Sequence, residues 1–88
     1  MRVTIVSVTK DGPVVDGEFH LSKDGRGIDI VAPEENQVWM AGMFEDQGFK
    51  TDPAEDPAGW LRELAEEYAN GSSMYAVLDT GIPESKEE

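Results

Sequence analysis

The stretch Asp56–Asn70, DPAGWLRELAEEYAN, decides the fold because it carries the signals of an amphipathic helix. Asp56 is a good N-cap residue, and Pro57 suits the first helical position. The apolar residues then recur at helical spacing and form one stripe, made by Trp60, Leu61, Leu64, Ala65 and Tyr68. Asn70 and the following Gly71 favour the end of the helix there. Such a stripe needs an apolar surface to cover it.

Short β-branched segments supply that surface. Residues 2–9 are rich in Val, Ile and Thr and predict a strand. Its apolar side chains would point to both faces of the sheet, which indicates that the strand is either central or bulged. Residues 14–22 alternate apolar and polar residues, and residues 28–31 continue this pattern. The Asp-Gly pair within residues 23–27 predicts a hairpin turn between these two strands. Residues 74–78 predict a last strand after the helix.

The segment 33–44 fits two structures. A proline followed by two glutamates is typical of the first turn of a helix. Against a helix, Gly42 would lie in its interior. The apolar run 38–44 also suits a strand that follows a turn, and we favour this strand over the helix.

Together these elements predict a single α+β domain over residues 1–80, in the order β-β-β-(β)-α-β. We expect a small, mainly antiparallel sheet of four or five strands, with one helix (about 56–70) packed on one face. Residues 81–88 are expected to form a flexible acidic tail.

The charge of the chain is strongly negative and unevenly distributed. The formal net charge is −12 over 88 residues. Residues 34–67 alone hold ten acidic residues against Lys50 and Arg62. Such a field repels nucleic acid and anionic membranes and attracts basic proteins. We therefore expect no direct binding to nucleic acid or to membranes.

The composition also limits the chemistry. The chain has no cysteine, which excludes disulfides and thiolate metal sites. No apolar run is long enough to span a membrane, and no signal peptide is recognisable, so we expect a soluble cytoplasmic protein. His20 is the only histidine, and on an alternating strand it should face solvent. We predict no catalytic residue, no metal ligand and no cofactor, because paired acids in loops or on a wet helix face stay ionised.

Two sets of residues are candidates for binding a partner. The first is acidic and lies in the long loop and on the wet face of the helix: Glu45, Asp46, Asp52, Glu55, Asp56, Glu63, Glu66 and Glu67. The second is apolar and consists of Trp39 and Met43, which would form an exposed patch if Trp39 lay on the outer face of the sheet.

These features favour a non-enzymatic module that binds a basic protein surface, such as that of a nucleic-acid-binding protein or a nuclease. Small acidic inhibitors of restriction or CRISPR systems, which mimic nucleic acid, and immunity proteins of toxic nucleases share this size and charge, and the likeness goes no further. The alternatives are a housekeeping domain adapted to a salt-rich cytoplasm, a subunit of a larger complex, and a small magnesium-dependent enzyme that uses carboxylates. An open sheet edge on so short a chain also permits a homodimer.

Overall fold

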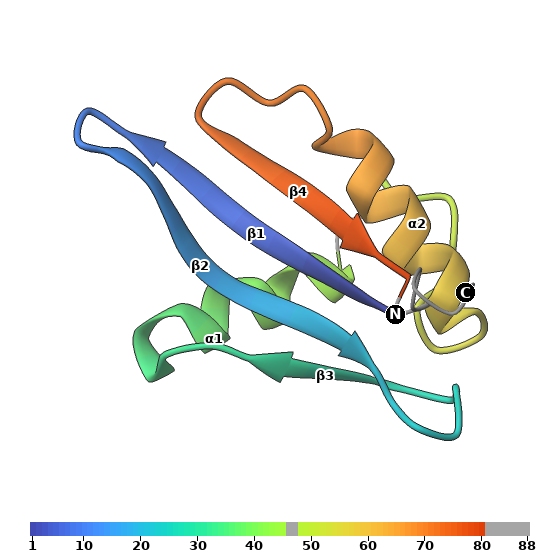
Figure 1. Ribbon diagram of the computed structural model, residues 1–88. Helices are drawn as coiled ribbons and strands as arrows, with labels where there is room; N and C mark the ends of the chain where they lie inside the picture. Colours follow the sequence, from blue (N-terminus) through green and yellow to red (C-terminus); the bar gives the residue numbers. More distant parts are fainter. Residues whose placement is uncertain (46–47, 81–88) are drawn as a thin grey trace, which may run out of the picture.

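The computed structural model describes residues 1–45 and 48–80 (Figure 1). These residues form an α+β fold in the order β-β-β-α-α-β. The strands are β1 (Arg2–Thr9), β2 (Gly12–Leu21), β3 (Ile28–Val31) and β4 (Met74–Asp79). The helices are α1 (Glu34–Gly42) and α2 (Pro57–Glu67), and a short 3-10 turn, η1 (Met43–Glu45), follows α1. The α+β class is thus confirmed, and the predicted tail 81–88 lies outside the described residues.

The four described strands form one antiparallel sheet in the order β3-β2-β1-β4. Of the two alternatives for residues 2–9, the central strand is confirmed, because β1 lies between β2 and β4. The bulge lies in the neighbouring β2 and not in β1. Gly17 lies opposite Ile5 and Val15 lies opposite Val6, so Asp16 is the additional residue. The Ser7 hydroxyl donates a hydrogen bond to the Asp16 carboxylate across this irregularity.

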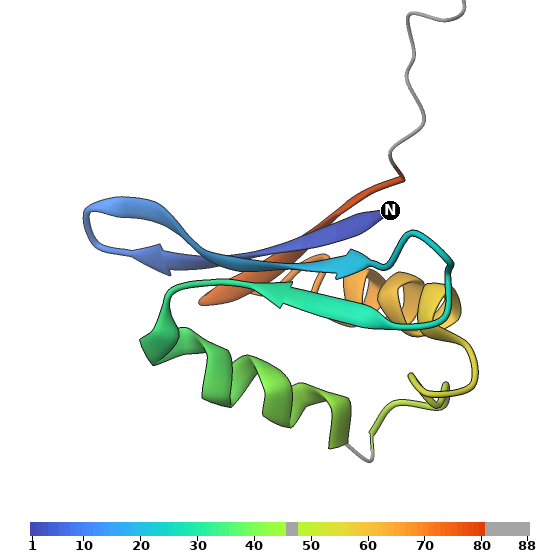
Figure 2. The same ribbon diagram turned by 90° about the horizontal axis from the view of Figure 1, so that it is seen from below.

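Both helices cover the same face of the sheet (Figure 2). The core lies between the sheet and the helices and draws residues from every layer. Its buried members are Val3, Ile5, Phe19, Met40, Met43, Trp60, Leu61, Leu64 and Ala76. The predicted stripe of α2 therefore packs as expected on the apolar face of the sheet. No other element of the described chain covers the opposite face.

The segment 33–44 is a helix, so the predicted fourth strand over 38–44 is wrong. The helical first-turn signal was correct, whereas the apolar run was misleading, because its first two members point to solvent. Val38 is 81% exposed and Trp39 is 39% exposed. Met40 and Met43 are three residues apart and share the buried side of the helical path. The strand prediction thus failed because apolar residues that are neighbours in the chain, such as Trp39 and Met40, lie on opposite sides of the helix.

The position of α1 depends on the missing side chain of Gly17. A Cβ atom at this residue would lie 2.5 Å from the Ala32 Cβ and 2.8 Å from the Met40 sulfur. Real Cβ atoms do not approach other atoms so closely, so only glycine lets Met40 reach the sheet here. The Asn36 side chain adds a hydrogen bond of 3.0 Å to the Asp16 carbonyl and fixes the start of α1 beside the bulge.

The substitution Gly17→Ala should destabilise the protein by about 1–3 kcal/mol, because the methyl group must displace α1 from β2. Urea unfolding followed by circular dichroism measures this change. Gly42→Ala is the matched control, since no atom lies within 4 Å of its Cβ position, and it should be neutral or stabilising. Equal stabilities for the two variants would contradict the close packing at Gly17.

Candidate functional site

One glutamate fixes the long loop to α2. The Glu63 carboxylate accepts hydrogen bonds from the backbone N–H groups of Lys50, at 2.7 Å, and Thr51, at 2.9 Å. These bonds hold the pKa of Glu63 below its ordinary value, with the Lys50 N–H contributing most. Next to them, the ring of Phe49 stacks on Trp60 with centroids 5.3 Å apart. The loop is thus attached to α2 by one polar and one apolar contact.

Two other acidic residues of the loop also have local structural roles. The Asp56 carboxylate accepts a hydrogen bond from the Gly59 N–H at 3.0 Å and caps α2. The Asp52 carboxylate accepts a hydrogen bond from the Ala54 N–H at 2.9 Å and tightens the turn before the helix. These two acids and the glutamate of α2 shape the surface as well as charging it. Asp46, another predicted binding residue, lies outside the described residues.

Four of the predicted acids remain available to a partner: Glu45, Glu55, Glu66 and Glu67. All four are exposed. Their carboxylates form no hydrogen bond or ion pair with any residue in 1–45 or 48–80. We call these four residues the open acidic set. Their charge is not neutralised by the described part of the protein itself, so a partner cation can reach it.

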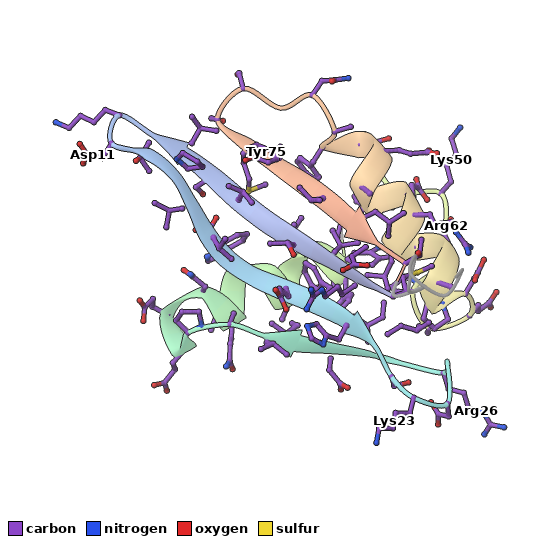
Figure 3. The ribbon with its side chains drawn as sticks, viewed as in Figure 1. Asp11, Lys23, Arg26, Lys50, Arg62 and Tyr75 are labelled. Carbon is purple, nitrogen blue, oxygen red and sulfur yellow. The ribbon has the colours of Figure 1, made fainter. Side chains whose placement is uncertain are left out.

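The nearby cations do not cancel this charge. Lys50 and Arg62 project outward beside α2, and Lys23 and Arg26 lie at the β2–β3 hairpin (Figure 3). None of the four forms a close ion pair with a described carboxylate, and the charge of Lys50 acts on the Glu63 carboxylate only as the smallest influence on its pKa. The region made by η1, the described loop and α2 therefore keeps an excess of negative charge.

The expected apolar patch of Trp39 and Met43 is not formed. Met43 is only 9% exposed and belongs to the core, because the helical path turns it toward the sheet. Trp39 remains exposed on α1, and its indole N–H donates a hydrogen bond to the Asn36 side chain at 3.1 Å. A contact through this region would rest on Trp39 alone.

The uncovered face of the sheet carries a small ionic cluster. The Arg2 guanidinium lies 3.8 Å from the Glu18 carboxylate and 3.3 Å from that of Asp79. His20 lies on the same face, as predicted, and its Nε2 is 2.6 Å from the Glu18 carboxylate. These charges largely satisfy one another. Within residues 1–45 and 48–80, no three His, Asp or Glu side chains are grouped closely enough to share a metal ion.

A groove that the sequence did not reveal runs between α2 and the edge of β4. Its volume is about 490 Å³. Two alanines create the hollow because they leave space where larger residues would fill it: Ala65 of α2 and Ala69 of the turn that follows the helix. The edge residues of β4 form its other side, and Arg62 and Glu66 lie at its rim. Small residues on a helix beside an edge strand are the only sequence signal for such a groove.

No helix in the described residues is both long and apolar enough to cross a membrane. Comparison of the chain with protein-family models, with curated protein sequences and with solved structures gives no match. The function must therefore be argued from the surface itself.

Acid should weaken the fold in part through Glu63. Its pKa is depressed in the folded state, so its contribution to the free energy of unfolding is complete above the ordinary glutamate value of about 4.3 and is lost as the pH falls through the folded value. Glu63→Gln removes the titrating group, so the free energy of unfolding should fall less steeply between about pH 5 and pH 3 than in the wild type.

Urea unfolding at several pH values measures this slope. Glu66→Gln is the control, because that carboxylate bonds no described residue and should leave the slope nearly unchanged. Parallel pH profiles for the wild type and Glu63→Gln would show that the carboxylate does not hold the loop.

Proposed function

We propose that the protein is a non-enzymatic acidic module that binds the basic, nucleic-acid-binding surface of a partner protein and thereby inhibits that partner. The observation that carries the proposal is the open acidic set, which presents carboxylates with no partner in the described part of the chain. Exposed carboxylates near a rigid helix can occupy positions that the phosphates of a nucleic acid would take on a basic groove.

Preorganisation supports this function. Glu66 and Glu67 project from a helix, and Glu55 lies directly before the Asp56 cap. The Glu63 hydrogen bonds and the stacking of Phe49 on Trp60 hold the described part of the loop in a fixed position beside that helix. A partner then orders little of the chain when it binds, which lowers the entropic cost of association.

An enzymatic role has less support. The candidate catalytic groups are carboxylates in water and one histidine whose ring already contacts Glu18. A magnesium-dependent enzyme would need clustered ligands, and the described residues offer no such cluster. The proposed role is that of the acidic anti-defence proteins of phages or of nuclease immunity proteins, which this chain resembles in size and charge.

Reversal of charge on α2 should abolish partner binding. The double variant Glu66→Lys/Glu67→Lys replaces two members of the open acidic set. We expect the bound fraction of the partner to fall at least about tenfold, because charges at an interface both attract the partner and slow its dissociation. Capture of partners from a lysate of the native host at low salt, read by mass spectrometry, measures this fraction.

Glu34→Lys/Glu35→Lys is the matched control. It changes the net charge equally and alters another exposed pair of helical glutamates, at the start of α1. It should retain most of the binding, provided that circular dichroism shows an intact fold. Equal losses from the two variants would mean that only net charge matters, and no loss from either would contradict the proposal.

A further inference from the structure

The outer edge of β4 is divided into a covered half and an open half. Near the start of the strand, the Ala76 N–H donates a hydrogen bond of 3.2 Å to the Tyr68 carbonyl. The turn at Gly71 also lies against the Met74 carbonyl, since a Cβ atom on Gly71 would be 1.8 Å from that oxygen. The chain between α2 and β4 therefore covers the first residues of the edge.

The second half of this edge presents backbone groups to solvent. In an antiparallel pair, alternate residues bond the neighbouring strand and the residues between them point away. The Ala76 N–H points away from β1, toward Tyr68. The Ala76 carbonyl points the same way, and so do the N–H and carbonyl groups of Leu78, two residues further along the strand. No described residue bonds them.

The open half of the edge lacks the usual protection. Exposed edges are commonly guarded by a lysine, a proline or a bulge. The stretch from Ala76 to Leu78 has none of these, and Val77 and Leu78 are 49% and 36% exposed. An unprotected edge with exposed aliphatic side chains is a template for one more strand.

The groove lies along this same edge. It is lined by Ala65 of α2, by Ala69 in the turn after the helix and by the edge residues of β4, and Figure 1 shows α2 and β4 side by side. A strand that adds to the edge would direct every second side chain toward the hollow on the helical side. The hollow and the unpaired backbone are two independent features, and both suit the same kind of ligand.

We propose that an extended segment of the partner protein adds to β4 as a fifth strand and places aliphatic side chains in the groove beside α2. The unpaired carbonyl and N–H groups select an extended backbone rather than a helix. The segment should carry Lys or Arg between its aliphatic residues, because the chain as a whole has a net charge of −12, although Arg62 offsets Glu66 at the rim of the groove itself. This basic character rests on the function proposed above.

A second copy of the chain fits this edge less well. If the β4 strands of two copies paired antiparallel with Leu78 opposite Leu78, Ala76 of each copy would lie opposite residue 80 of the other. Pairing at that position would need the Ala76 N–H, which already donates to the Tyr68 carbonyl. The two copies would also each carry a net charge of −12. An extended partner segment of basic character avoids the charge repulsion, and it meets the occupied Ala76 N–H once rather than twice.

A synthetic peptide of alternating Val and Lys residues, acetylated and amidated, is the probe for this inference. Titration into the full-length ¹⁵N-labelled protein should shift the amide resonances of residues 76–78, and the amide hydrogen of Leu78 should exchange more slowly with solvent when the peptide is bound. Analytical ultracentrifugation of the free protein reports any self-association through the same edge.

N-methylation of the peptide tests the backbone pairing without altering the protein. In an extended peptide, the backbone N–H groups of the Val residues point to one edge and those of the Lys residues to the other. A methyl group on the Val nitrogens or on the Lys nitrogens therefore removes the donors of one edge only. One of the two peptides should bind at least about tenfold more weakly, and the other should bind as the parent does. Loss with methylated Val indicates an antiparallel fifth strand, and loss with methylated Lys indicates a parallel one. Equal affinities of both methylated peptides would overturn the inference.

Variants of the edge provide a second measurement. Leu78→Pro removes an outward N–H and no ladder hydrogen bond, so the fold should tolerate it. It should bind the parent peptide at least about fivefold more weakly than Leu78→Ala, which keeps that N–H. If only Glu66→Lys/Glu67→Lys and added salt weaken binding, the edge inference fails while the proposed acidic recognition stands. Absence of measurable binding to the wild type at millimolar peptide also overturns the edge inference, and the lysate experiment then tests the proposed function separately.

Discussion

Trp60 is the contact on which the rest of the structure depends. Its side chain is fully buried, and its ring meets three others that come from different segments: Phe19 of β2 at 5.4 Å, Phe44 of η1 at 4.9 Å and Phe49 of the loop at 5.3 Å. Aromatic pairs in such geometries contribute about 0.5–1.5 kcal/mol each beyond the burial of their area. One residue of α2 thus joins the sheet, the end of the α1 segment and the long loop in a small core.

This arrangement also produces the charged surface. Glu63 lies one turn after Trp60 on α2, so the helix that anchors the aromatic cluster also fixes the backbone at Lys50 and Thr51. The acids around this anchor divide into two kinds. Those that bond the backbone shape the surface, and the charge of the open acidic set is not neutralised by the described residues. The groove beside β4 depends on the same helix, because Ala65 of α2 and Ala69 of the turn after it line the groove next to the sheet edge.

Much of the fold could be predicted from the sequence. Caps and periodicity located α2, and alternation located the strands. The hairpin turn predicted at the Asp-Gly pair is present, and Gly25 has the positive φ that such turns need, 73°. The segment 33–44 failed because the exposure of Val38 could not be recognised from hydropathy. The acidic region could be predicted from charge alone. The hydrogen bonds of Glu63 could not, because they join it to Lys50 and Thr51, which precede it by 13 and 12 positions in the chain. The open edge of β4 could not be predicted, since it depends on where the turn at Gly71 crosses the strand.

The central claim is that the acidic surface takes the place of a nucleic acid on its partner. The most direct test captures the partner on immobilised protein at low salt and then elutes it with duplex DNA or RNA, compared with buffer of equal ionic strength. The account predicts elution by the nucleic acid at a concentration where the matched buffer releases little, because both ligands compete for one basic surface. A partner that stays bound with excess nucleic acid, or that binds both ligands together, would contradict it.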